Sequence, residues 1–270
     1  MISLITATLG RINEVERLLN SLSKQTFKDF EIIIVDQNDH LELKKIVSKF
    51  TNLNLVYIRS SQKGLSLNRN IGLSKAKGDI IGFPDDDCYY DSKLLESVIN
   101  TFKNDKDCVL VAVNAKDTET EDVFLDFSGQ RIVRSQLLKR CISYNFFMRR
   151  KNNMQFDIRL GVGAAFGSGE ETDFLWEYFS IEDYGLFCSG AFVHHPHNQS
   201  YTNVKRALTY GKGMGAIFKK EIVYRHHFRA IFTFLKMLTR SLVGLIIRPE
   251  KTFFYNTFWG RITGFFSYKI

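Results

Sequence analysis

Residues 30–36 read FEIIIVD, a short run of apolar side chains that ends in an aspartate. A segment of strand length that is apolar at nearly every position is typical of a strand buried on both faces of a parallel sheet. Further strand-like segments lie at 2–8, 54–60, 79–83 and 109–115, and segments with helical spacing of apolar residues lie between them, for example at 12–25, 66–77 and 92–103. This alternation predicts an α/β fold with a mostly parallel central sheet and helices on both faces.

Polar side chains occur where three of these strands are expected to end. Thr8 closes the first strand, Asp36 closes the second, and the acidic run Asp85–Asp87 follows the strand at 79–83. Ligands of open α/β sheets bind beyond the carboxyl ends of the strands. The sequence therefore predicts a binding site that these positions share.

The acidic run lies in the segment GFPDDDCYY, residues 82–90. If the strand continues through it, alternate side chains project to one face, so that Asp85 and Asp87 converge while Asp86 points away. Two converging carboxylates suit a hard divalent cation that also binds phosphate oxygens. The alternative interpretation is a solvated acidic turn without a ligand.

The composition limits other kinds of site and location. The four cysteines lie far apart without a CxxC pair, which disfavours a zinc site or a disulfide framework. No signal-peptide pattern is apparent, and the longest apolar stretch near the C-terminus is interrupted by Lys236, Arg240 and Arg248. Because a spanning helix needs about 18 residues with few or no charges, we expect a cytoplasmic protein.

Four segments occur in an order and spacing typical of one enzyme family. They are ISLITATLGR (2–11), QTFKDFEIIIVDQND (25–39), KGLSLNRNIGLSKAKGDIIGFPDDD (63–87) and GSGEETDF (167–174). Together they resemble the family-2 glycosyltransferases, which are inverting enzymes of the GT-A fold that use nucleotide-diphosphate sugars. The resemblance implies a glycosyltransferase domain over 1–200, with a nucleotide-binding half at 1–115, an acceptor and catalytic half at 116–200, and a separate tail at 201–270.

The resemblance assigns the nucleotide to residues at the strand ends. Thr8 and Asp36 would hold the nucleobase and ribose, with Asp36 accepting the N3–H of a uracil ring, and Asp85 would face the ribose or the metal. Arg69 would reach Asp36 or the diphosphate, because its planar fork binds either one in a bidentate manner. From the residues alone, Asp36 is equally compatible with a helix cap and Arg69 with a surface arginine. The resemblance favours a UDP-sugar as the donor. The identity of the nucleobase stays open, because Gln37 stands where the family has a second aspartate.

The resemblance also implies a divalent metal, Mn²⁺ or Mg²⁺, held by Asp87 and Asp85. A histidine often completes the metal shell in the family, and the V-x-H-P spacing within FVHHPHNQ (192–199) selects His195. Imidazole is a better ligand for manganese than for magnesium. The alternative is a structural histidine.

A second acidic group, in GSGEETDF, is the candidate general base. Inverting transfer needs a base that takes the proton of the acceptor hydroxyl as its oxygen attacks the anomeric carbon. The family's Glu-Asp pair aligns with Glu170 and Glu171, so Glu171 is the first candidate and Asp173 a competitor. Acidic residues stabilised by the dipole of a helix first turn would give the same pattern.

The tail carries most of the positive charge of the chain, with thirteen Lys and Arg after residue 200 against Glu221 and Glu250. Residues 228–247 have apolar side chains on one helical face and Arg229, Thr233, Lys236 and Arg240 on the other, and 251–266 is rich in aromatic residues. Such helices suit an anionic bilayer surface. A helical cap or a dimer surface is the alternative, and so much apolar bulk disfavours nucleic-acid binding.

The sequence thus predicts an inverting, metal-dependent glycosyltransferase on the inner face of a cell membrane. Its acceptor would be a saccharide hydroxyl, and a lipid-linked saccharide of bacterial surface-polysaccharide assembly is favoured. A sugar nucleotidyltransferase and a non-catalytic nucleotide- or membrane-binding scaffold are the alternatives.

Overall fold

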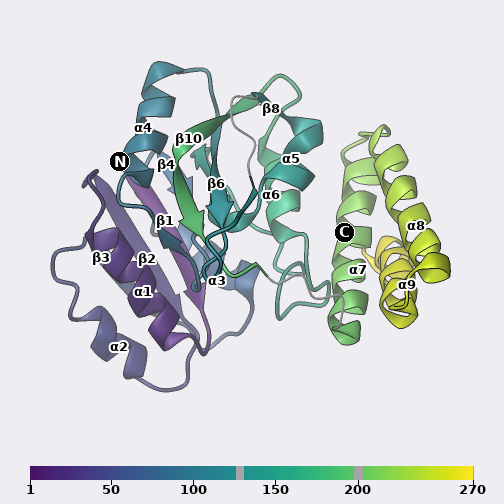
Figure 1. The fold of residues 1–270 in the computed structure, drawn as a ribbon, viewed down its shortest axis with the longest axis horizontal. Coiled ribbons are helices and arrows are strands. Elements are labelled where there is room, and N and C mark those ends of the chain that lie inside the picture. Colours follow the sequence, from purple (N-terminus) through teal and green to yellow (C-terminus); the bar gives the residue numbers. More distant parts are fainter. Residues whose placement is uncertain (126–130, 198–202, 270) are drawn as a thin grey trace. The chain divides into compact units, whose positions relative to one another are not determined.

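The computed structural model describes residues 1–125, 131–197 and 203–269. The chain forms two compact units (Figure 1). The first, called the sheet unit here, comprises Met1–Lys63, Leu67–Gln155 and Leu175–His197; the second, called the helical unit, comprises Gly64–Ser66, Phe156–Phe174 and Asn198–Ile270.

The strands are β1 (Ile2–Thr8), β2 (Phe30–Asp36), β3 (Leu55–Arg59), β4 (Ile80–Gly82), β5 (Tyr89–Tyr90), β6 (Leu110–Lys116), β7 (Val123–Leu125), β8 (Arg131–Val133), β9 (Phe146–Arg149) and β10 (Tyr184–His194). The α-helices are α1 (Ile12–Ser23), α2 (Glu42–Val47), α3 (Leu65–Leu73), α4 (Leu94–Asn104), α5 (Leu137–Arg140), α6 (Glu170–Tyr178), α7 (Val204–Lys219), α8 (Ala230–Ile247) and α9 (Lys251–Ser267). Two 3₁₀ turns, η1 (Arg134–Gln136) and η2 (Ser143–Asn145), and a π-helical turn, η3 (Lys220–Tyr224), complete the described elements.

Over the described residues, the strands form one sheet in the order β3-β2-β1-β4-β9-β6-β10-β5, with β7 paired to β6 and β8 to β10. The neighbours β3, β2, β1 and β4 are parallel, as are β6 and β10. By contrast, β9 runs antiparallel between β4 and β6, and β5, β7 and β8 are antiparallel to their partners. The sheet is therefore mixed. The sequence analysis recognised β1, β2, β3, β4 and β6, whereas it did not recognise β5, β7, β8, β9 and β10, most of which pair antiparallel.

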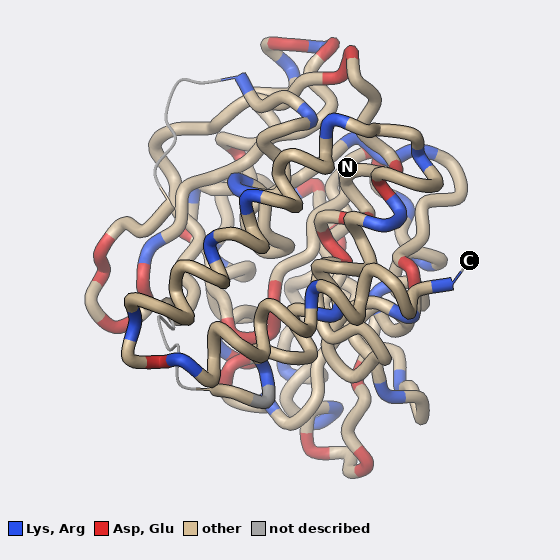
Figure 2. Tube along the Cα trace, turned by 90° about the vertical axis from the view of Figure 1, so that its right-hand side faces the viewer, with Lys and Arg blue, Asp and Glu red and all other residues tan. Residues whose placement is uncertain are grey.

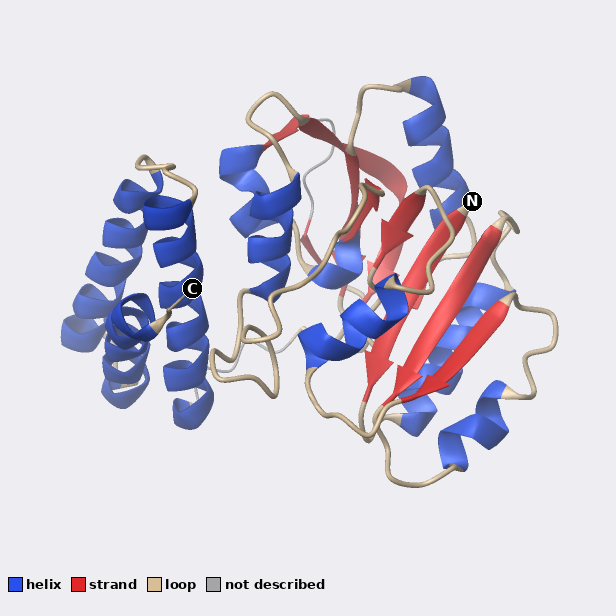
Figure 3. Ribbon diagram, turned by 180° about the vertical axis from the view of Figure 1, so that it is seen from behind, coloured by secondary structure: helices blue, strands red, loops and turns tan. Residues whose placement is uncertain are grey.

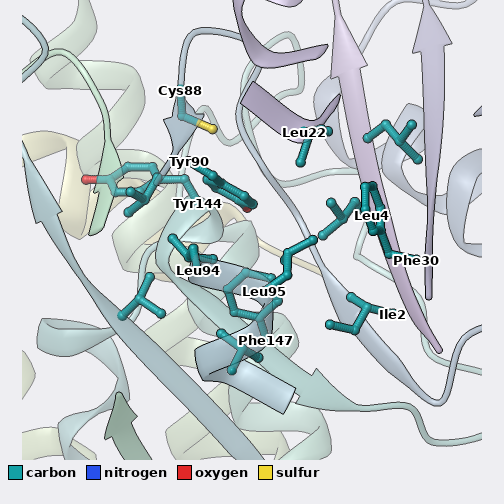
Figure 4. Close-up of a cluster of buried hydrophobic side chains, with 14 of the residues drawn as sticks. Ile2, Leu4, Leu22, Phe30, Cys88, Tyr90, Leu94, Leu95, Tyr144 and Phe147 are labelled. Atoms are coloured by element: carbon teal, nitrogen blue, oxygen red, sulfur yellow. The ribbon is translucent and has the colours of Figure 1, made fainter. Parts of the chain in front are cut away.

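Helices cover both faces of the sheet, as predicted (Figure 3). On one face, α1, α2 and α4 pack over the alternate strand residues of a single apolar cluster, in which Leu4, Leu95 and Phe147 have no exposed surface (Figure 4). On the other face, α3 lies so close that a methyl group added at Gly72 would collide with Ile5. Each fully buried side chain of this size stabilises the fold by about 1.5–3 kcal/mol.

In the helical unit, α7 and α9 cross at glycines. An added Cβ at Gly211 would lie 2.9 Å from the Cα of Gly260, and one at Gly264 would collide with the carbonyl of Lys212. The spacing Gly260-x-x-x-Gly264 places both glycines on one side of α9, where they let the two backbones touch. This contact fixes α9 against α7 without large side chains between them.

Helix α8 matches the amphipathic segment expected near residues 228–247. It is 18 residues long with a mean hydropathy of 1.7, and 17% of it is buried. By length and composition alone it is apolar enough to cross a membrane, although the sequence expectation treated Lys236 and Arg240 as interrupting such a span. Its buried positions are Phe234, Ser241 and Gly244.

The contact between α7 and α9 at their glycines predicts that alanine at position 264 destabilises the helical unit, although alanine usually stabilises a helix. Alanine is favoured over glycine in a free helix by about 1 kcal/mol. We nevertheless expect Gly264→Ala to destabilise the helical unit by about 1–3 kcal/mol, because the added methyl group meets backbone rather than a flexible side chain. Hydrogen exchange of α7 and α9 measures the effect, with the exposed Thr263→Ala as the control. Greater protection in Gly264→Ala would show that the two helices do not touch there.

Candidate active site

Asp85, Asp86 and Asp87 follow β4 in a turn. The strand ends at Gly82, and the carbonyl of Asp85 accepts a hydrogen bond from the amide of Cys88 at 3.2 Å. The expectation that the strand continues through the aspartates was therefore wrong. The convergence of Asp85 and Asp87 comes from the turn, in which Asp86 accepts a hydrogen bond from Arg11.

His195 lies beside the same two aspartates. Strand β5 pairs with β10 so that His194 is opposite Tyr89, which brings the next residue, His195, to the acidic turn. Its Nε2 lies 3.2 Å from Asp87 Oδ1 and 3.7 Å from Asp85 Oδ2. Its ring stacks on Tyr144 at 4.1 Å, which fixes the ring plane.

The tautomer of His195 suits metal binding. Its Nδ1 lies 2.9 Å from the carbonyl oxygen of Pro196, and because a carbonyl only accepts, Nδ1 carries the proton. Nε2 then faces the carboxylates with its lone pair, as in histidines that ligate metals while the other nitrogen donates to a carbonyl. Without a cation, this nitrogen must bind a second proton to lie against Asp87.

These three side chains fit a divalent cation. One ligand atom from each of Asp85, Asp87 and His195 lies within 4.8 Å of the others. Asp87 Oδ1 is buried and faces His195 Nε2, so a cation between the two atoms would meet a lone pair of each. Two carboxylate oxygens and one imidazole nitrogen are a donor set that Mn²⁺ accepts readily.

Arg11 supplies positive charge to the turn in this structure. Its Nη1 lies 2.9 Å from Asp86 Oδ1 and also contacts Asp87 Oδ2. Burial raises the pKa of Asp86 to about 6 despite the opposing charge of Arg11. Burial would also raise the pKa of Asp87, but His195 and Arg11 hold it below its usual range.

Asp85 is fixed by two donors. The guanidinium of Arg69 donates to Asp85 Oδ1 at 2.7 Å, and the hydroxyl of Ser143 donates to the same oxygen at 2.9 Å. Arg69 is 2% exposed and lies over the ring of Phe83 at 6.0 Å. It is therefore a buried arginine that holds the acidic turn rather than a surface residue.

Thr8 and Asp36 lie directly opposite each other on the parallel strands β1 and β2. Asp36 is fully buried, and both of its carboxylate oxygens have partners. Oδ1 accepts from the amide of Asn38 at 2.8 Å, and Oδ2 accepts from the hydroxyl of Tyr57 at 2.5 Å. A nucleobase N–H at Asp36 would have to share or displace one of these bonds. The neighbouring Gln37 is 4% exposed.

The second acidic group begins α6. Glu170, Glu171 and Asp173 all lie in the first turn of this helix, after Gly169 with φ of +86°. The helix-turn interpretation is thus correct for all three, and it does not exclude a catalytic role. Glu171 is half-buried, and its Oε2 is buried without a hydrogen-bond partner among the described residues.

Asp173, by contrast, is engaged on both oxygens. Lys220 Nζ donates to Oδ2 at 2.6 Å and Arg225 Nη2 donates to Oδ1 at 2.8 Å. Lys220 also reaches Asp157 Oδ2 at 3.0 Å. Burial would raise the pKa of Asp157, but hydrogen bonds from Arg159 and Tyr268 and the charge of Lys220 hold it far below its usual range. This cluster ties α6 to the turn after α7.

The family of the chain follows from its sequence. The model described as Glycosyl transferase family 2 matches residues 3–165. The chain belongs to this family. The match includes β1, β2, the acidic turn and Arg69, and it overlaps three of the four segments on which the resemblance rests.

Several curated relatives are glycosyltransferases too. An uncharacterized glycosyltransferase of Haemophilus influenzae is 27% identical over 229 residues, 78% of this chain and 75% of that protein. The cholesterol galactosyltransferase of Borreliella burgdorferi is 23% identical over 267 residues, 87% and 74% of the two chains. A GalNAc(5)-diNAcBac-PP-undecaprenol β-1,3-glucosyltransferase of Campylobacter jejuni is 30% identical over 104 residues, only 37% and 32% of the two chains.

Solved structures confirm the predicted GT-A fold. TarS 1–349 of Staphylococcus aureus in complex with UDP-GlcNAc matches 99% of this chain and 73% of its own with a TM-score of 0.61 at 17% identity. The Pyrobaculum calidifontis mannosyltransferase PcManGT in complex with GDP-Man and Mn²⁺ matches 99% of this chain and 88% of its own with a TM-score of 0.64 at 10% identity. In a second TarS structure, the match covers 82% of this chain and 40% of the TarS chain.

Sequence reasoning missed several residues of both sites. Arg11, Ser143 and Tyr144 were not assigned, although Arg11 lies in the quoted segment ISLITATLGR. Lys220 and Arg225 were counted only as part of a basic tail. Their separation of five residues, with Glu221 between them, gave no signal that both would converge on Asp173.

The ion pairs of Asp173 predict a local stability effect. Lys220→Met keeps the apolar stem but removes the charge, and breaking a buried ion pair typically costs about 3–5 kcal/mol. Because Arg225 remains on Asp173, we expect a loss of about 3 kcal/mol, the lower end of that range. Hydrogen exchange of α6 and η3 measures it, with the exposed Lys236→Met as the control. Equal protection in the two variants would contradict a stabilising role for the cluster.

Proposed function

We propose that this family-2 glycosyltransferase is an inverting, metal-dependent enzyme that transfers a sugar from a nucleotide-diphosphate sugar to a saccharide hydroxyl. The observation that carries the metal-dependent part is the Asp85, Asp87 and His195 cluster, in which one ligand atom of each residue lies within 4.8 Å of the others. A solvated acidic turn would not direct a histidine lone pair at the same point.

The donor half of the reaction belongs to the acidic turn. Asp87, Asp85 and His195 would hold the cation, which when bound supplies positive charge to the diphosphate leaving group. Arg69 keeps Asp85 in place through its 2.7 Å hydrogen bond. Thr8 stands at the neighbouring strand end, within the region proposed for the nucleoside.

A UDP-sugar is the proposed donor. This chain shares its fold with TarS, which was solved in complex with UDP-GlcNAc, and with PcManGT, which was solved in complex with GDP-Man and Mn²⁺. At the base site, both oxygens of Asp36 already accept hydrogen bonds, from Asn38 and Tyr57. Gln37, with an amide that both donates and accepts, is therefore a further candidate for reading the base edge.

Glu171 is the proposed general base. It would accept the proton of the acceptor hydroxyl as that oxygen attacks the anomeric carbon, so that the configuration inverts. A base needs a free lone pair, and Glu171 Oε2 has one among the described residues. Both oxygens of Asp173 are bound by Lys220 and Arg225, which favours a positioning role for it.

The two roles are separable by a pair of variants. We expect Asp87→Asn to lose both turnover and the Mn²⁺-dependent binding of UDP, because it removes a metal ligand. We expect Glu171→Gln to lose turnover by about 10²–10⁴-fold, the usual contribution of a general base, while UDP binding with Mn²⁺ stays unchanged. Calorimetric titration and a sugar-transfer assay measure the two properties.

Glu177→Gln, an exposed change later in α6, is the matched control. Full turnover in Glu171→Gln would remove it as the base. Full turnover in both Asp87→Asn and Glu171→Gln would instead favour a scaffold that uses neither residue. A sugar nucleotidyltransferase is disfavoured already, since the chain belongs to a glycosyltransferase family.

We further propose that α8 and α9 lie on an anionic membrane surface. Apolar side chains point outward from both helices, with Phe232 74%, Ile246 76% and Phe266 73% exposed. On α8, the exposed Lys236 and Arg240 border this apolar face. After residue 200 the chain has thirteen Lys and Arg against Glu221 and Glu250, and Figure 2 marks basic positions in blue and acidic ones in red. An apolar face bordered by cations is typical of a helix in the plane of a membrane.

An orientation in the membrane plane fits α8 better than one across it. In a spanning helix of 18 residues, Lys236 and Arg240 would lie near the middle of the bilayer, where each costs about 2.5–3.5 kcal/mol. In the plane, both reach the lipid headgroups. A lipid-linked saccharide acceptor, on the cytoplasmic face of a bacterial membrane, is the substrate that such a location favours. The Campylobacter jejuni relative is named for an undecaprenol-linked saccharide, which supports this choice of acceptor.

Vesicle flotation tests the membrane proposal. Each cation near an anionic surface contributes about 1 kcal/mol, so Lys236→Ala with Arg240→Ala should weaken binding to vesicles that contain phosphatidylglycerol about 30-fold. Binding of the unchanged protein should also fall as salt rises. Lys44→Ala with Lys45→Ala removes the same charge from the exposed side of α2 and should change nothing. Failure of the unchanged protein to float with anionic vesicles at low salt would refute membrane binding.

A further inference from the structure

The acidic turn holds more negative charge than its fixed partners neutralise. Arg69 is committed to Asp85, and His195 faces Asp85 and Asp87. Arg11 is a further cation at the carboxylates, and its guanidinium contacts both Asp86 and Asp87. In the described residues, Arg11 thus lies on an oxygen of the same carboxylate that the proposed cation needs.

The side chain of Arg11 can move away from the acidic turn more easily than that of Arg69. The Arg69 side chain is 2% exposed and that of Arg11 is 46% exposed. The backbone before Arg11 is held by a hydrogen bond from the amide of Gly10 to Asn38 Oδ1 at 2.7 Å. A fixed backbone with a half-exposed side chain lets the guanidinium change partner while the loop keeps its place.

We propose that Arg11 competes with the divalent cation for Asp87 and, once displaced, binds the diphosphate of the donor. Two positive groups on one carboxylate repel each other, so a cation at Asp87 Oδ1 weakens the contact of the guanidinium with Asp87 Oδ2 and favours its release. The planar fork of an arginine binds phosphate oxygens in a bidentate manner. This inference rests on the metal site of the proposed function and makes Arg11 the link between metal binding and donor binding.

The competition predicts in which direction UDP changes the affinity for the cation. Without nucleotide, Arg11 opposes the cation and lowers its affinity. With UDP present, the guanidinium has a new partner and no longer competes, so the cation binds more tightly. Such coupling between two ligands is typically about 5–150-fold and is reciprocal, so the cation must tighten UDP binding by the same factor.

Titration of Mn²⁺ into the full chain, with and without saturating UDP, tests the proposal. In the unchanged protein, UDP should raise the Mn²⁺ affinity by a factor in that range. In Arg11→Ala, the affinity without UDP should rise while the affinity with UDP stays close to that of the unchanged protein, so that the factor falls. Arg11→Lys, which keeps the charge but loses the fork, should give an intermediate factor. Lys49→Ala, which removes an exposed cation paired with Glu16, is the charge-matched control and should leave the factor unchanged.

The outcomes separate this inference from the function on which it rests. If Arg11→Ala weakens Mn²⁺ binding both with and without UDP, Arg11 only holds the carboxylates in place, and the proposal is wrong. Unchanged affinities in Arg11→Ala overturn it as well. If the unchanged protein binds no Mn²⁺ under either condition, the metal site of the proposed function fails, and this inference fails with it.

Discussion

Repulsion among three consecutive carboxylates is the constraint on which the sheet unit depends. Asp85–Asp87 lie in one turn, and positive groups from three distant parts of the chain approach them. Arg11 comes from the loop after β1, Arg69 from α3, and His195 from the end of β10. The parallel pairing of β1 with β4 and the antiparallel pairing of β5 with β10 bring these elements to the same edge.

The first half of the fold could be predicted because its signals are local. Strands such as 30–36 are continuous apolar runs, and β2 has those bounds in the structure. The antiparallel β9, by contrast, lies between β4 and β6 through a pairing across a long stretch of chain, which a short window of sequence does not encode. Helix α7 falls within the tail that was expected to be helical, but its bounds were not predicted, because Gly211, Gly213 and Gly215 disfavour an isolated helix. In the structure, Gly211 and Gly215 lie against α9 and Gly213 lies against Ser168.

The sequence predicted which acidic residues and which histidine form the candidate metal site, but it did not predict the cations that pair with them. Resemblance selected Asp87 and His195, and the structure brings both together with Asp85. It did not select Arg11 or Lys220, because an ion pair depends on where two side chains meet in space. The positive charge of the tail illustrates this limit. Lys220 and Arg225 are engaged inside the helical unit, which leaves the exposed cations of α8 for an outside partner.

The glycine contact between α7 and α9 bears on how the helical unit behaves in different solvents. Backbones that touch directly are held by dispersion forces, which act in hydrocarbon as well as in water. A helix pair held by large apolar side chains would lose its driving force among lipid tails. Here the backbones touch while large side chains of α9, such as Trp259 and Phe266, are exposed, so the glycine contact itself does not depend on whether those side chains meet solvent or acyl chains.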